Sequence, residues 1–95
     1  MPSSVPIRSS QDLGQLIAAA RRRRSLTQRQ VAEALGVTQA WISKVERGGQ
    51  KTRIGQVLRL ASSLEIRIAG EIAPPSAKSP VEATRDYPDL DDLLD

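Results

Sequence analysis

The stretch from Thr27 to Glu46 reads TQRQVAEALGVTQAWISKVE, and it decides the fold. Two short apolar patterns of helical period flank Gly36, a residue type that readily adopts the left-handed conformation in which many helices end. A threonine precedes each pattern, and Thr27 is followed three residues later by Gln30, which is the spacing of a capping box. The stretch therefore predicts two helices joined by a tight turn, and the second helix of such a pair can enter the major groove of DNA.

Apolar residues at helical spacing predict another helix before this stretch. Ser9, followed three residues later by Asp12, supplies side-chain oxygens that can satisfy the free N–H groups of a helix start. Four consecutive arginines at 21–24 suit the negative carboxyl end of the same helix. The expected buried stripe of this helix comprises Leu13, Leu16, Ile17 and Ala20.

A fourth helix is predicted after the paired glycines at 48 and 49, with Thr52 as the residue that opens it. The last three helices each have one apolar side that can face a common core. The residues expected there are Val31, Ala32, Leu35, Val37, Ile42, Val45, Ile54, Val57, Leu58, Ala61 and Leu64. The predicted fold is therefore mostly α, a small helical domain built around a helix-turn-helix.

The hydrophobic period changes from helical to alternating after the fourth helix. Residues 65–72 place Ile66, Ile68 and Ile72 on one face and charged residues on the other, which predicts a β-strand. No second strand pattern occurs in the chain, so the economical partner is the same strand of another copy, antiparallel about a two-fold axis. A homodimer with a two-stranded sheet is therefore expected. The alternative is that the segment continues the fourth helix or frays, although its glycine and its isoleucines disfavour a helix.

The chain divides into three parts. Residues 1–8 are expected to form a flexible arm, residues 9–73 the DNA-binding and dimerisation domain, and residues 74–95 an acidic, disordered tail. Residues 1–78 hold 13 Lys and Arg against 5 Asp and Glu, a net charge of +8, whereas residues 79–95 hold 1 against 6, a net charge of −5. The basic body suits a polyanion, and the acidic tail suits a different partner or competes with the first, unless both charges only solubilise the chain.

The composition excludes several classes of function. The 95 residues include no Cys and no His, which removes disulfides, thiolate chemistry, the commonest metal ligand and the commonest general base. The chain is too short for a large core, so we expect no enzyme, no metal and no cofactor. No apolar run approaches the roughly 20 residues of a membrane span, and residues 1–10 do not resemble a secretory signal. The composition therefore predicts a soluble, cytoplasmic binding protein.

Four outward residues of the motif's second helix have the chemistry of base reading. Gln39 can form two hydrogen bonds with adenine, and Ala40 can contact a thymine methyl group. Lys44 can donate to guanine, and Ser43 can serve a base or a phosphate. The alternative is an ordinary solvated helix face, but the preceding helix and the cap spacing favour DNA. Because a dimer presents two such helices, a palindromic operator in double-stranded DNA is expected.

Phosphate contacts position a protein on DNA without reading its sequence. The candidates for such contacts are Gln28, Arg29, Trp41, Arg47, Lys51 and Arg53. Trp41 has a second possible role as a lid over the small core, and Arg8 in the arm is a candidate for a minor groove. The arginines at 21–24 form the densest positive run, and some of them are expected to face solvent and steer the encounter with DNA.

The central stretch resembles the helix-turn-helix domain of the phage-repressor family (Cro/C1 or XRE type, lambda-repressor-like), over roughly residues 10–64. The resemblance is carried by Thr27-Gln28, Val31-Ala32, Leu35-Gly36-Val37, Gln39, Ile42-Ser43 and Glu46-Arg47-Gly48. It implies that the helix from Gln39 to Lys44 is the recognition helix and that Gln28 binds phosphate.

Within that family the chain is most similar to the HipB-type antitoxins, on Gln39-Ala40, Ile42-Ser43 and the run from Ser62 to Ile66. In those proteins a strand after the fourth helix makes an intersubunit sheet, as residues 65–72 would. The resemblance implies a nucleoid-associated dimeric autorepressor of a type II toxin-antitoxin module that binds and neutralises a HipA-type kinase toxin. Two alternatives stay open: a stand-alone XRE-family repressor without a toxin, and an adaptor whose basic body binds something other than DNA.

Overall fold

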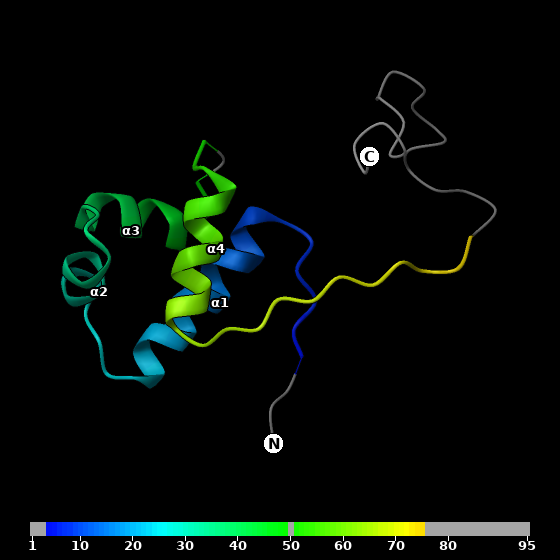
Figure 1. Ribbon diagram of the computed structural model, residues 1–95, viewed down its shortest axis with the longest axis horizontal. Coiled ribbons are helices and arrows are strands. Elements are labelled where there is room, and N and C mark those ends of the chain that lie inside the picture. The colour runs from blue at the N-terminus through cyan, green and yellow to red at the C-terminus, as the bar shows by residue number, and fades with distance from the viewer. Residues whose placement is uncertain (1–3, 50, 76–95) are drawn as a thin grey trace.

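The structure is a computed structural model that describes residues 4–49 and 51–75 (Figure 1). These residues form four helices: α1 (Ser10–Arg23), α2 (Gln28–Leu35), α3 (Gln39–Glu46) and α4 (Ile54–Ser63). Helices α1 and α2 both pack against α3, and side chains of α4 complete the same core. The helical domain and the order of its four helices are therefore as the sequence predicts.

Local side-chain chemistry sets the bounds of the central pair of helices. The Thr27 hydroxyl accepts a hydrogen bond from the Gln30 N–H at 3.0 Å, while the Gln30 side chain accepts one from the Thr27 N–H at 2.8 Å. The Thr38 hydroxyl accepts from the Trp41 N–H at 3.0 Å. Gly36, with φ of 70°, ends α2 in the left-handed conformation. The capping box, the second cap and the glycine turn are all confirmed.

The two outer helix starts have different outcomes. Ser9 caps α1, because its hydroxyl accepts a hydrogen bond from the Asp12 N–H at 3.1 Å. The prediction that Thr52 opens α4 is wrong. The Thr52 hydroxyl instead donates to the Gly49 carbonyl oxygen at 3.2 Å, and the N-cap of α4 is Arg53, which makes no side-chain cap. Since the hydroxyl is used within the turn that follows α3, α4 begins one residue later without a cap of its own.

Ile17, Ile42 and Leu60 are completely buried and form the centre of the core. The predicted stripe of α4 is partly wrong, because the side chains of Ile54 and Leu58 are 65% and 44% exposed. The buried residues of this region, at 57, 60, 61 and 64, follow the spacing i, i+3, i+4 and i+7. Ile54 and Leu58 lie on the flank of that stripe, and Leu60, which is not in the predicted stripe, lies at its centre.

The segment after α4 leaves the helical body. α4 ends at Ser63, and Glu65 has a φ of 60°, so the alternative in which this segment continues the helix is wrong. Ile66 still packs against the core, whereas Ile68 is 48% and Ile72 95% exposed. Figure 1 shows the trace running away from the helices as an extended line. Within 4–49 and 51–75 no residue is assigned to a strand, so the intersubunit pairing stays a prediction.

The outer parts of the chain are only partly described. Residues 4–8 of the predicted arm are exposed and have no regular secondary structure. Most of the predicted acidic tail, from residue 76 onward, lies outside the described residues. Among the helices that the structure does describe, none has both the length and the apolar character needed to cross a membrane.

Candidate nucleic-acid interface

Helix α3 has one side in the core and one toward solvent. Ile42 and Val45 are buried, which fixes the rotation of the helix about its axis. The outward side comprises Gln39, Ala40, Ser43 and Lys44, of which Ser43 is half-buried and the others are exposed. The four predicted base-reading residues therefore share one surface on a single helix. That they read bases stays a prediction.

The first helix crosses the end of α3 at very close range. A Cβ atom added to Gly14 would lie 2.6 Å from the carbonyl oxygen of Glu46, and it would be closer still to that of Val45. The hydroxyl of Ser10 also donates to the Gly48 carbonyl oxygen at 2.9 Å. Gly14 is not among the residues predicted to form a site, although a glycine within a helix costs about 1 kcal/mol relative to alanine and is itself a signal of close packing.

A mostly buried carboxylate ties three helices together. Glu46, at the end of α3, accepts hydrogen bonds from the Arg21 guanidinium at 2.7 and 3.0 Å and from the Gln28 amide at 3.0 Å. The same guanidinium donates to the Leu26 carbonyl oxygen at 2.8 Å. The side chains of Arg21 and Glu46 are only 11% and 6% exposed. Residues from α1, α2 and α3 therefore meet at one ionic centre at the end of α3.

The surroundings of Glu46 favour its ionised form. Burial of this carboxyl raises its pKa, but the hydrogen bonds from Arg21 and Gln28, with the charges of Arg21 and Arg22, outweigh burial. The pKa of Glu46 is consequently lower than the ordinary value of 4.5. Arg21 responds in the opposite sense, since its hydrogen bond to Glu46 raises the guanidinium pKa. Both partners are therefore charged at neutral pH.

The predicted phosphate contacts fall into different settings. Gln28 gives one amide hydrogen to Glu46 and keeps a second donor. Arg29 pairs with Glu33 at 3.2 Å, an exposed contact one helical turn along α2 that contributes little to stability. Trp41 is half-buried and packs against the core, as the structural reading of that residue expects. The exposed members of the set include Arg47, Lys51 and Arg53.

A polar recess lies where α1, α2 and α3 meet. Its volume is about 260 Å³. The residues that line it are Gln15, Ala18, Arg22, Gln28, Ser43, Glu46 and Arg47. The structure thus brings together three predicted contact residues, Gln28, Ser43 and Arg47. Arg22 also lines this recess, a position that could not be predicted from the run of four arginines alone.

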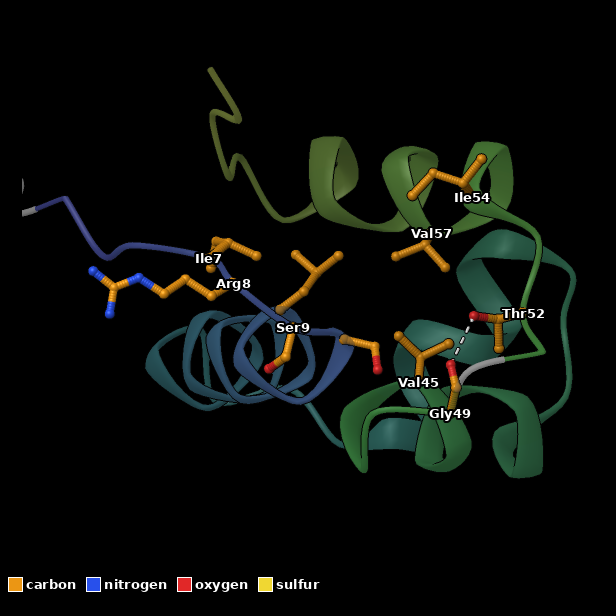
Figure 2. Close-up of a pocket in the computed structure, with 10 residues that line it drawn as sticks. Ile7, Arg8, Ser9, Val45, Gly49, Thr52, Ile54 and Val57 are labelled. Carbon is orange, nitrogen blue, oxygen red and sulfur yellow. Dashed lines mark hydrogen bonds between the residues drawn. The ribbon is translucent and has the colours of Figure 1, made fainter. Parts of the chain in front are cut away.

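A second depression, about 500 Å³ in volume, is mainly apolar (Figure 2). Its lining consists of Ile7, Arg8, Ser9, Ser10, Leu13, Val45, Gly49, Thr52, Ile54 and Val57. Arg8 is the one titratable side chain among them, and Figure 2 shows its guanidinium directed away from Val57 and Val45. In the described part of the chain, no group of three or more His, Cys, Asp or Glu residues could hold a metal ion.

Comparison with solved structures finds the same fold. A HipB variant in complex with an O2 20mer is similar at 26% identity and a TM-score of 0.67, over 76% of this chain and 100% of that chain. HipB in complex with an O4 20mer is similar at 25% identity and a TM-score of 0.66, over 75% of this chain and 100% of that chain. The HipA-HipB-O2-O3 complex is similar at 24% identity and a TM-score of 0.66, over 75% of this chain and 100% of that chain, and this likeness shows the fold alone. A search of curated proteins found no match.

A family model described as a helix-turn-helix domain matches residues 12–66. That range is more than half of the chain, and it runs from the first turn of α1 to the residue that still packs on the core after α4. It includes the capped turn at Gly36 and the whole outward side of α3. The chain therefore belongs to the XRE-like helix-turn-helix family of DNA-binding domains, and its structural likeness is to the HipB antitoxins.

Proposed function

We propose that this protein binds double-stranded DNA in a sequence-specific manner, with the outward side of α3 in the major groove. The observation that carries the proposal is the placement of Gln39, Ala40, Ser43 and Lys44 on one solvent-facing surface. The inward side of the same helix packs in the core, and its last residue is held by the Arg21–Glu46 pair. A helix fixed in this way can dock without first being ordered, which lowers the entropic cost of binding.

The proposed contacts divide by role. Gln39, Ala40, Ser43 and Lys44 read base edges, and the phosphate contacts are Gln28, Arg29, Trp41, Arg47, Lys51 and Arg53. A net charge of +8 over residues 1–78 supports a polyanionic partner. The protein acts by binding, not by catalysis.

We further propose that the protein acts as a homodimer on a palindromic operator. Residues 65–72 pair with their copy as an antiparallel two-stranded sheet, with Ile66, Ile68 and Ile72 on its apolar face. The exposure of Ile68 and Ile72 supports this pairing, because two large apolar side chains in an extended segment gain stability when a second copy covers them. A two-fold pair would present its two α3 helices to half-sites one or two helical turns apart, about 34 Å for each turn.

The biological function we propose is that of a HipB-type antitoxin. Such a protein represses its own operon in the nucleoid and neutralises a HipA-type kinase toxin. Support comes from the fold likeness to HipB in its 20mer complexes and in the complex that also contains HipA. The second candidate is a stand-alone repressor of the same family, in which the acidic run of residues 79–95 only tunes affinity by charge competition.

The test of DNA reading compares two glutamines on different helices. The full chain is bound to duplexes that carry the palindrome upstream of its own gene, with every base pair varied in turn. Gln39→Ala should cost about 1–3 kcal/mol at one base pair of each half-site and relax the preference there. Gln56→Ala, at an exposed position of α4, is the matched control and should leave both affinity and preference intact. Unchanged base preference in Gln39→Ala would rule out this reading surface.

The test of the antitoxin function is co-purification with the product of a neighbouring kinase-like gene. A stable complex that blocks kinase activity supports the antitoxin. Specific operator binding together with the absence of any such complex supports the stand-alone repressor. Deletion of residues 76–95 adds a second comparison: tighter DNA binding indicates charge competition, and loss of the toxin complex indicates that the tail docks on the toxin.

A further inference from the structure

The polar recess between α1, α2 and α3 has an unusual set of side chains for a surface hollow. Arg22 and Arg47 both line it, together with the half-buried hydroxyl of Ser43 and the amide of Gln28. Gln15 and Ala18 form its α1 wall, and with Arg22 they follow the helical spacing i, i+3 and i+7. One face of α1 therefore borders the recess over two turns.

The negative charge in the recess is already matched. Glu46 receives two hydrogen bonds from Arg21, which lies inside the domain, and a third from Gln28. Within 4–49 and 51–75, neither Arg22 nor Arg47 has a carboxylate within 4.0 Å. The recess therefore keeps two guanidinium groups that form no ion pair within 4.0 Å with an acidic side chain of the described residues, and the charge of one of them, Arg22, also favours ionised Glu46.

We propose that this recess binds one backbone phosphate of the DNA beside α3, with Arg22 and Arg47 as its charged ligands. The inference rests on the proposed DNA binding and adds α1 to the contact surface. Guanidinium groups form short, strong, paired hydrogen bonds with phosphate oxygens, and the free Gln28 amide hydrogen supplies a further donor. A phosphate held next to Ser43 would set the depth and register of α3 in the groove.

The same geometry separates the four consecutive arginines by role. Arg21 is internal and pairs with Glu46, and Arg24 pairs with Glu65 at 3.1 Å. Arg23 is exposed and does not line the recess. Arg22 and Arg23 are thus adjacent and equally charged, and both are exposed, but only the first borders the proposed phosphate site. This pair provides a matched comparison.

The experiment measures operator affinity as a function of salt for the full-length wild type, Arg22→Gln and Arg23→Gln. Each phosphate contact contributes about 0.9 to the slope of log K against log salt concentration. Arg22→Gln should reduce the slope by about 0.9 per protomer, on operator and on scrambled duplex alike. Arg23→Gln should change it by much less. Arg22→Lys, which keeps the charge, should retain most of the slope.

Ethylation interference provides a second readout that a general loss of charge would not produce. In the wild type, ethylation of the phosphate held by Arg22 should weaken binding at one position per half-site. In Arg22→Gln that position alone should become insensitive, while Arg23→Gln should keep the wild-type pattern.

Equal slopes and equal interference patterns in the two variants would overturn the phosphate site while leaving DNA binding intact. A wild type that binds no duplex with sequence preference would instead overturn the proposed function itself. Thermal melting of each variant checks the fold. If Arg22→Lys melted like the wild type but had the same reduced salt slope as Arg22→Gln, that result would also contradict the site.

Discussion

Arg21 and Glu46 lie 25 residues apart in sequence and are joined by two hydrogen bonds of 2.7 and 3.0 Å. This pair fixes the end of α1 to the end of α3, and through Gln28 it also fixes the start of α2. The orientation of α3 therefore depends on this ionic contact between distant parts of the chain as well as on the buried side chains of Ile42 and Val45.

Removing the arginine of this pair should destabilise the protein strongly. Arg21→Ala leaves the carboxylate of Glu46 mostly buried and without its cation, which typically costs about 3–5 kcal/mol. Arg21→Lys keeps a charge but loses the paired geometry, so its cost should be intermediate. Urea unfolding measures both. Arg23→Ala, an exposed neighbour, should stay within about 0.5 kcal/mol of the wild type, and an equal loss in the two alanine variants would refute the assignment.

The pKa of Glu46 predicts a pH dependence of the free energy of unfolding. Since the folded-state pKa is lower than the ordinary value of 4.5, ionised Glu46 stabilises the folded state above that value. The stabilisation is lost as the pH falls through the folded-state pKa. Glu46→Gln should therefore be less stable than the wild type at pH 7, and the difference should shrink below pH 4.5. Urea unfolding from pH 7 to pH 3 measures it, and a constant difference would contradict the prediction.

Two glycines in helices should respond to alanine with opposite signs. A Cβ at Gly14 would collide with backbone carbonyl oxygens of α3, so Gly14→Ala should cost about 1–3 kcal/mol and shift that helix. A Cβ at Gly55 would meet no atom within 4 Å, and Gly55→Ala should stabilise α4 by about 0.5–1 kcal/mol. Thermal melting compares them. Operator affinity should fall only in Gly14→Ala.

The dimer strand can be tested with two adjacent residues on opposite faces. Ile68→Asn should weaken self-association, because it places an amide on the apolar face of the proposed sheet. Arg67→Asn alters the other face and should leave the dimer intact. Sedimentation velocity over a range of concentrations measures both, with circular dichroism as a check on the helices. A fully dimeric Ile68→Asn would argue against pairing through this segment.

The caps and turns could be predicted from sequence because they depend on residues three or four positions apart. Thr27, Thr38 and Gly36 act on their own neighbours, so their chemistry can be read without knowing the fold. Thr52 shows the limit of the same reasoning. Its hydroxyl could either cap α4 or form a hydrogen bond within the turn after α3. In the structure it forms the hydrogen bond within the turn, to the Gly49 carbonyl oxygen.

The contacts that orient the site could not be predicted in this way, because they join residues far apart in sequence. The sequence does not distinguish Arg21 from the three arginines that follow it, because its partner Glu46 lies 25 residues away on α3. The recess beside Arg22 likewise requires three helices at once. Leu60 was missed for a smaller reason. The apolar residues of α4 allow two adjacent buried stripes, one that includes Leu58 and one that includes Leu60. Only the packing of the core selects the stripe with Leu60.

Within the described residues, the side chains of Gln39 and Ala40 make no hydrogen bond to the body of the domain, while the ionic centre that holds α3 is at Glu46, the last residue of the helix. The residues that hold α3 in place are thus different from Gln39 and Ala40, which are proposed to read bases. Descendants of this sequence could exchange one target sequence for another by changing two side chains at little cost in folding, so divergence of recognition need not await compensating mutations.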